Sequence, residues 1–138
     1  MIYKPHHTAI SVRDLSKSLK FYETLGYEQV HRYSESDGSM SIVHLKLGES
    51  YLEVFCYAKN QKQPKLEYQY ANNLEEVGVK HIALKTDDVT AALADLKAKG
   101  LADDATKIDV SDTGKASWFF VQDPDGVWVE IIKDDRYK

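Results

Sequence analysis

An internal repeat is the feature that most constrains how this chain can fold. The ten residues that begin at His7, HTAISVRDLS, align with the ten that begin at His81, HIALKTDDVT. The histidine, the alanine two positions later and the aspartate at the eighth position are the same in both copies. A repeat of this kind predicts two copies of one supersecondary unit, each burying an apolar face. We therefore expect the 138 residues to form one domain built from two similar modules.

Each copy is expected to form a strand followed by a helix. Apolar and polar residues alternate at the start of each copy and then change to the spacing of a helical face. Ser16 and Thr90, or the aspartates two residues before them, offer side-chain acceptors for the first helical amides. Gly26 and Gly100 suit the left-handed position that follows a helix. The expected strands are 7–12 and 81–86, and the expected helices are 17–25 and 90–99.

Further strands complete each module. They are expected at 27–33, 41–47, 51–57, 117–122 and 127–133, with Gly-Glu-Ser and Asp-Pro-Asp-Gly turns between the last two of each copy. The pattern predicts an α+β fold with module 1 at about 1–57 and module 2 at about 79–135. The linker at about 58–78 is either a lid over a binding site or a solvated connection.

Each module contributes one histidine and one glutamate at matching positions. Glu53 and Glu130 lie in strongly apolar strands, where burying an unpaired carboxylate is costly. His7 and His81 begin the two alternating strands. If the modules pack about a pseudo-twofold axis, two imidazoles and two carboxylates converge, and that donor set suits a divalent first-row metal. A single strand histidine is more often structural, but matched pairs in a repeat favour a metal site.

The other histidines are interpreted as structural. His6 is predicted to point to the opposite strand face from His7. His31 and His44 have no counterpart in the second copy.

Composition narrows the class of protein. No apolar stretch approaches the roughly 20 residues that cross a bilayer, and the first residues lack the apolar segment of a secretory signal. The net charge of −4 is not accompanied by a basic stripe, which argues against a nucleic-acid partner. Cys56 is the only cysteine, so no disulfide can form within the chain and a reducing compartment is expected. These features predict a soluble cytoplasmic protein whose partner is either a small molecule or another protein.

Four segments together resemble the glyoxalase I family of the vicinal-oxygen-chelate superfamily. They are residues 7–14, 21–27, 78–84 and 123–130. The resemblance implies two βαβββ modules whose strands form a paired, partly closed, barrel-like sheet. It implies that one divalent ion per site (Ni, Co, Zn or Mn) is bound through His7, Glu53, His81 and Glu130. It also implies a homodimer, with the site either within one chain or across the two chains.

The implied reaction is that of a lactoylglutathione lyase. The metal binds two neighbouring substrate oxygens and stabilises an enediolate, while a carboxylate beside it moves the proton. Glu130 is the first choice for this base and Glu53 the second. The expected substrate is the hemithioacetal of methylglyoxal and a thiol, or a similar compound with vicinal oxygens.

Some residues depart from the family pattern. The position four residues after the first ligand is typically an arginine that binds the glutathione carboxylate, but here it is Ser11. Lys107 and Lys115 are the candidates for the basic residues expected before the penultimate strand. The identity of the thiol therefore stays open.

Alternatives within the superfamily also stay open. Acyl-CoA epimerases use four ligands and a proton abstraction, so they fit almost as well as a glyoxalase. Extradiol dioxygenases and fosfomycin thiol transferases use three ligands, so a fourth ligand at Glu53 argues against them. Antibiotic-sequestering modules of this fold are not enzymes and usually lack the ligand residues, whereas all four are present here.

Overall fold

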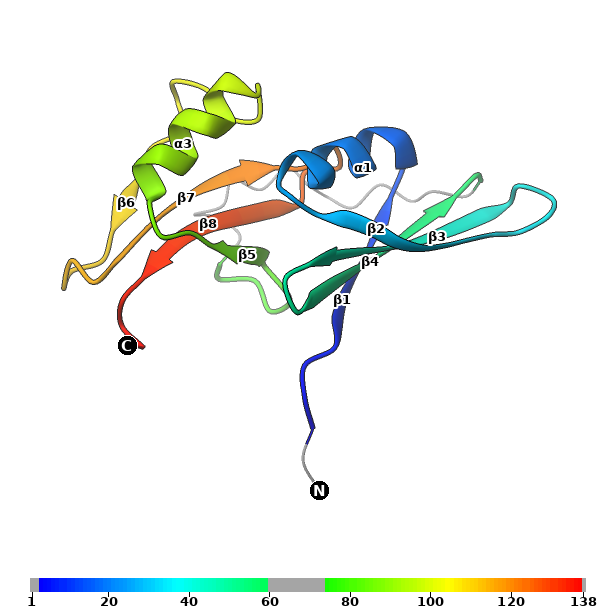
Figure 1. The fold of residues 1–138 in the computed structure, drawn as a ribbon, viewed down its shortest axis with the longest axis horizontal. Helices are drawn as coiled ribbons and strands as arrows, with labels where there is room; N and C mark the ends of the chain where they lie inside the picture. Colours follow the sequence, from blue (N-terminus) through cyan, green and yellow to red (C-terminus); the bar gives the residue numbers. More distant parts are fainter. Residues whose placement is uncertain (1–2, 60–73, 138) are drawn as a thin grey trace. The chain divides into compact units, whose positions relative to one another are not determined.

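The computed structural model describes residues 3–59 and 74–137, and the chain divides into two compact units, Met1–Pro64 and Lys65–Lys138. In each unit a strand and a helix are followed by three strands (Figure 1). The first unit contains β1 (His7–Val12), α1 (Leu15–Thr24), β2 (Glu28–Ser34), β3 (Met40–Leu47) and β4 (Ser50–Tyr57). The second unit contains β5 (His81–Lys85), α3 (Val89–Ala98), β6 (Asp109–Val110), β7 (Ala116–Gln122) and β8 (Trp128–Asp134).

Both units have the same sheet topology. The strand orders are β1-β4-β3-β2 and β5-β8-β7-β6. The first strand of each unit lies parallel to the last, and all other neighbours are antiparallel. Ala9 pairs with Glu53 in one sheet, and Ala83 pairs with Glu130 in the other. The repeat in the sequence is therefore also a repeat of strand register.

Helices α1 and α3 each begin after an aspartate. Asp14 Oδ1 accepts a hydrogen bond from the Lys17 amide at 3.0 Å. Asp88 Oδ1 accepts from the amides of Thr90 and Ala91 at 3.0 and 2.9 Å. These carboxylates satisfy amides that have no partner within the helix, so the aspartates are the N-caps and the hydroxyls two residues later are not.

A tight loop fixes the register of β3 and β4. Leu47 pairs with Ser50, so the loop consists of Gly48 and Glu49 alone. Gly48 has a φ of 57°, in the left-handed region that the first position of a primed hairpin turn requires. Counting back from this loop places residue 44 directly opposite residue 53.

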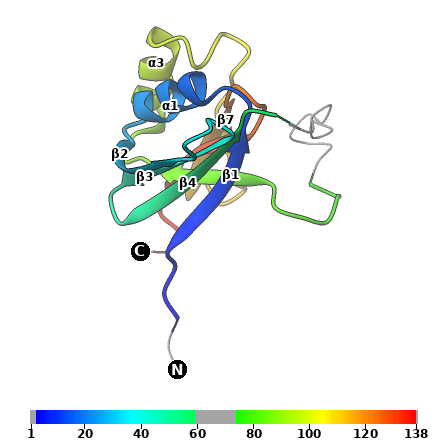
Figure 2. The ribbon, with the colours of Figure 1, turned by 90° about the vertical axis from the view of Figure 1, so that its right-hand side faces the viewer.

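The core of the first unit lies on one face of its sheet. Figures 1 and 2 show α1 across this face. Leu52 and Val54 are buried in the core, and Glu53 between them points to the opposite face because strand side chains alternate. The same alternation in β8 buries both neighbours of Glu130 and leaves this carboxylate on the other face. Each glutamate therefore avoids the apolar core that its sequence neighbours form.

The structure confirms the α+β class and the repeated architecture. The strands form two separate four-stranded sheets within the described residues and are not closed into a barrel. The two-residue strand β6 was not predicted, because so short a segment shows no alternation. The predicted linker at 58–78 lies mostly outside the described residues, so its role stays open. No helix in the part of the chain described is long and apolar enough to cross a membrane.

Candidate functional site

The second unit brings its histidine and its glutamate together. His81 on β5 and Glu130 on β8 lie on neighbouring parallel strands, and His81 Nε2 is 3.3 Å from Glu130 Oε2. Both side chains are largely buried, with 26% and 13% of their surfaces exposed. Phe120 on β7 lies directly opposite Glu130 in the sheet, and its ring meets that of His81 edge-on at 5.3 Å. The carboxylate thus has an imidazole beside it, and the residue opposite it in the sheet is aromatic.

The first unit contains the matching pair, with one addition. His7 Nε2 on β1 lies 3.8 Å from Glu53 Oε1 on β4. The other carboxylate oxygen, Glu53 Oε2, lies 2.8 Å from His44 Nε2 on β3. His44 occupies the position that Phe120 has in the second sheet, opposite the glutamate.

His44 was interpreted as structural, and its contact with Glu53 was not predicted because the predicted Gly-Glu-Ser turn is one residue longer than the observed loop. The two-residue loop between β3 and β4 sets the pairing, and that pairing places His44 beside Glu53.

His6 also differs from its predicted position. It precedes β1, so it does not follow the alternation of the strand, and its Nδ1 lies 2.7 Å from Nδ1 of His7. Its ring stacks on that of Tyr51, with centroids 5.8 Å apart. A hydrogen bond at Nδ1 leaves Nε2 of His7 to face Glu53, which is how histidine ligands are commonly oriented.

Within each unit, the distance between the histidine nitrogen and the glutamate oxygen is longer than a usual hydrogen bond. It is nearer to the distance between two donors bound to the same metal ion. An N–H···O bond is usually about 2.9–3.0 Å long, whereas the two pairs are separated by 3.3 and 3.8 Å. Two donors bound to one zinc at about 2.0–2.2 Å lie roughly 3–3.5 Å apart at tetrahedral angles. The His81–Glu130 pair has this spacing, and the His7–Glu53 pair needs only a small side-chain movement to reach it.

Each unit thus assembles two of the four residues predicted as ligands. Within residues 3–59 and 74–137, no group of three or more His, Cys, Asp or Glu side chains is arranged to hold a metal ion. The convergence of His7, Glu53, His81 and Glu130 on one ion therefore stays a prediction.

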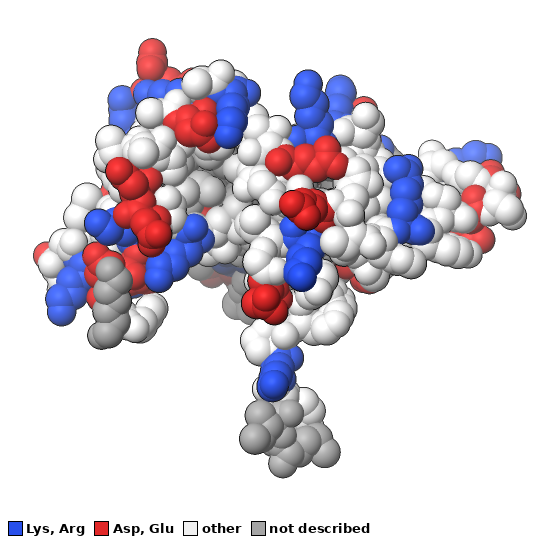
Figure 3. All heavy atoms as spheres, viewed as in Figure 1, with Lys and Arg blue, Asp and Glu red and all other residues white. Residues whose placement is uncertain are grey.

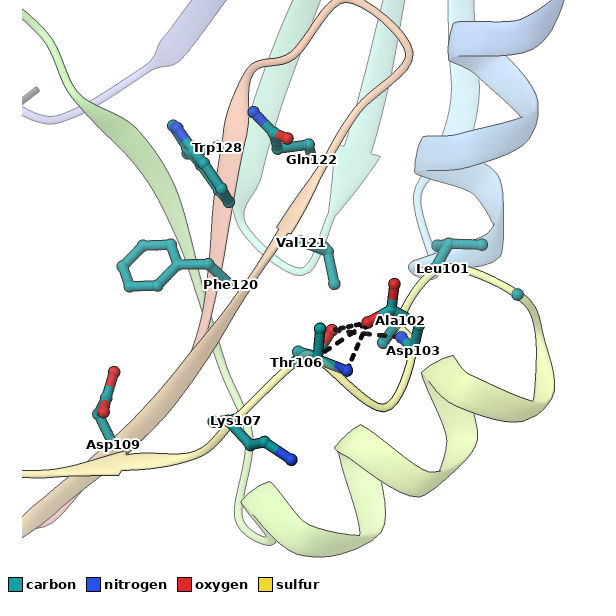
Figure 4. Close-up of a pocket in the computed structure, with 12 residues that line it drawn as sticks. Leu101, Ala102, Asp103, Thr106, Lys107, Asp109, Phe120, Val121, Gln122 and Trp128 are labelled. Carbon is teal, nitrogen blue, oxygen red and sulfur yellow. Dashed lines mark hydrogen bonds between the residues drawn. The ribbon is translucent and has the colours of Figure 1, made fainter. Parts of the chain in front are cut away.

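A pocket of about 640 Å³ lies in the second unit, and one of its lining residues, Phe120, has a ring in contact with that of His81 (Figure 4). It is bordered by the 100–109 segment that follows α3, and by Phe120 and Trp128 from the sheet. The two rings meet edge-on with centroids 6.0 Å apart. Asp103 Oδ1 accepts hydrogen bonds from the amides of Ala105 and Thr106, which shapes the wall of the pocket.

The polar residues considered for substrate binding have different positions. Lys107 lines the pocket, and its ammonium donates to the Asp104 carbonyl oxygen at 2.8 Å. Lys115 lies in the turn before β7 and is not among the residues that line this pocket. Ser11 is exposed on β1, on the same face as His7, because the two are four residues apart in a strand.

Comparison with known proteins agrees with this architecture. A lactoylglutathione lyase from Schizosaccharomyces pombe is 30% identical over 151 residues, covering 99% of this chain and 49% of that enzyme. The chain thus spans about half the length of that relative. The mitochondrial methylmalonyl-CoA epimerase of Homo sapiens is 28% identical, covering 91% of this chain and 71% of that enzyme. The structure of a trypanothione-dependent glyoxalase I from Leishmania major is 26% identical and covers 96% of this chain and 87% of its own, with a TM-score of 0.64.

The family itself follows from a match over most of the chain. The model of the Glyoxalase/Bleomycin resistance protein/Dioxygenase superfamily matches residues 4–131, a segment that contains both sheets almost completely. The repeated register and the two His–Glu pairs lie within it. The chain therefore belongs to the Glyoxalase/Bleomycin resistance protein/Dioxygenase superfamily.

Proposed function

We propose that the protein is a metal-dependent lyase or isomerase of the glyoxalase I type. Its substrate would be a thiol hemithioacetal, such as that of methylglyoxal, or another compound with two neighbouring oxygens. The observation that supports this most is that each sheet places a histidine Nε2 beside a glutamate carboxylate on the face opposite its core. The proposed ligands are His7, Glu53, His81 and Glu130, holding one Ni, Co, Zn or Mn ion. When bound, such an ion supplies a Lewis acid for a developing oxyanion and acidifies the adjacent C–H.

Glu130 is proposed as the general base. It removes the proton from the carbon that carries sulfur and oxygen and returns it to the neighbouring carbonyl carbon, so no oxidant or reductant is needed. Glu53 is the less suitable base because His44 is hydrogen-bonded to one of its oxygens. The residue opposite Glu130 is Phe120, whose ring has no N–H or O–H group to hold the carboxylate.

The thiol is proposed to be bound in the pocket of the second unit. Lys107 there offers a positive charge, while Ser11 has no charge for the carboxylate of glutathione. The Leishmania relative is trypanothione-dependent by its title, so thiols other than glutathione occur among similar proteins. A panel of thiols is therefore the appropriate substrate test.

We also propose a cytoplasmic homodimer that acts on small molecules. On the face drawn in Figure 3, Lys and Arg side chains lie among Asp and Glu side chains, and this mixture does not favour nucleic acid. The net charge of −4 agrees with this. Light scattering of the purified protein would give the oligomeric state.

The test is metal content combined with turnover. Purified protein is analysed for metals, then assayed with hemithioacetals of methylglyoxal and several thiols, beside Glu130→Gln and the matched control Glu28→Gln. Glu28 is an exposed carboxylate at the start of β2. We expect about one metal ion per site, and a loss of roughly a hundredfold or more in turnover for Glu130→Gln alone, the usual contribution of a general base.

Two other results would point elsewhere. Metal without turnover on any hemithioacetal would refute the lyase and favour an acyl-CoA epimerase, which is supported by the similarity to the human enzyme. An epimerase would return the proton to the carbon that lost it, so solvent deuterium would enter an acyl-CoA ester. No metal after incubation with Ni and Zn would favour a binding module that sequesters small molecules such as antibiotics.

A further inference from the structure

The two sheets share one register, but they differ at the position opposite the glutamate. This position holds His44 in the first sheet and Phe120 in the second. We infer that His44 is a positioning residue, which fixes Glu53 as a permanent ligand of the metal. The inference rests on the proposed metal site, and it adds a role for a residue outside the four ligands.

The geometry divides the two oxygens of Glu53 between two partners. Oε2 lies 2.8 Å from Nε2 of His44, a full hydrogen bond, and Oε1 faces Nε2 of His7 at 3.8 Å. A carboxylate with one oxygen tied in this way cannot rotate freely about its last bond. Its other oxygen is therefore presented toward His7 before any ion arrives.

His44 is itself held in place. The two-residue Gly48–Glu49 loop fixes the pairing of His44 with Glu53, so the two side chains emerge side by side on one face. On the other side, the ring of His31 from β2 lies 5.2 Å from the His44 ring. Three strands thus align His31, His44 and Glu53 in one row.

The second sheet shows what the same site is like without this contact. Phe120 has the position of His44, but its ring contacts His81 and offers no hydrogen to Glu130. The two glutamates therefore differ in the residue opposite them, a hydrogen-bonding imidazole for Glu53 and a phenyl ring for Glu130, although their strands have the same register. This difference agrees with the proposed roles, in which Glu53 is a fixed metal ligand and Glu130 moves as the base.

The expected effect is on metal affinity. Partners that orient a ligand typically contribute 10- to 100-fold to the affinity of a metal site. His44→Phe should therefore weaken metal binding by about 10- to 100-fold. The variant reproduces a pairing that already exists in the second sheet, Phe opposite Glu, so it should fold.

The experiment measures the dissociation constants for Zn and Co by competition with a chromophoric chelator. The variants are His44→Phe, His44→Leu and His44→Gln, with Tyr33→Phe, an exposed side chain of β2, as the control. The glutamine amide can still donate to Glu53, so His44→Gln should recover most of the affinity that His44→Phe loses. The visible spectrum of bound Co should change in the Phe and Leu variants but not in the control.

Each outcome supports or overturns the inference. Weaker binding in both donor-free variants, with recovery by glutamine and no change in the control, supports it. Equal affinity and an unchanged Co spectrum in all variants would overturn it, even if the protein is an active lyase. Metal binding without lyase turnover would refute the proposed activity alone, because affinity is measured without substrate. A wild-type protein that binds no metal would overturn both.

Discussion

Replacing Phe120 with histidine would give the second sheet the contact that distinguishes the first. Phe120 pairs with Glu130 just as His44 pairs with Glu53, so the new imidazole should reach the carboxylate at a similar distance, 2.8 Å in the first sheet. If Glu130 is the base, it must leave its resting position to take the proton. The substitution should therefore slow catalysis by holding the base in place.

The size of the effect follows from the strength of that hydrogen bond. Hydrogen bonds to charged groups contribute about 1.5–3 kcal/mol. If the bond must break before the proton moves, this energy adds to the barrier, and each 1.36 kcal/mol or so is a factor of ten in rate. We expect kcat to fall by about 10- to 100-fold, while metal affinity stays the same or rises.

The assay is steady-state kinetics on the best hemithioacetal, with metal content measured on the same samples. Phe120→Leu is the control, because it removes the ring that meets His81 without adding a donor. The reasoning would be wrong if Phe120→His, fully loaded with metal, turned over within twofold of the wild-type enzyme. It would also be wrong if Phe120→Leu lost as much kcat as Phe120→His, because the effect would then come from the missing ring.

Three further predictions concern stability. Asp88→Ala should lower the free energy of unfolding by about 1 kcal/mol. Asp14→Ala should lower it by less, because Asp88 accepts hydrogen bonds from two helical amides and Asp14 from one. Urea unfolding of both variants measures the difference. The hydrogen bond from Arg136 lowers the pKa of Asp134 from 3.8 to about 2. The pKa of Asp134 is lower in the folded protein than in the unfolded chain, so the stabilisation is complete above about pH 4 and disappears as pH falls through about 2. The melting temperatures of wild type and Asp134→Asn should therefore converge in acid. A difference that stays constant with pH would contradict this. Removing the proposed metal with a chelator should lower the melting temperature, and readdition should restore it; no shift would argue against an ion bound to the folded state.

The repeated architecture could be predicted from short sequence patterns. The matching strands around His7 and His81 and the glycines after each helix were enough to predict two equivalent modules. The helix starts were left between two candidates, and the structure shows that Asp14 and Asp88 are the caps. The sequence could not separate these options, because an acid and a hydroxyl two residues apart can both accept from the first helical amides.

That each module supplies one histidine and one glutamate was predicted, because it depends on the repeat. The structure places His7 beside Glu53 and His81 beside Glu130 on neighbouring parallel strands, and the convergence of all four on one ion stays a prediction. The contact of His44 with Glu53 was not predicted because it breaks the repeat, and symmetry was the basis of the prediction. A contact that occurs in only one copy is visible only in the pairing of the strands.

The family resemblance, most of the secondary structure and four candidate ligands of a divalent metal followed from the sequence alone. These depend on alternation, capping and turn residues, which act over a few positions along the chain. Tertiary structure decided which carboxylate oxygen faces which imidazole, and that Glu53 is hydrogen-bonded to His44 whereas Glu130 lies against Phe120. Those facts depend on strand register across a sheet, where residues distant in sequence approach within 3–4 Å.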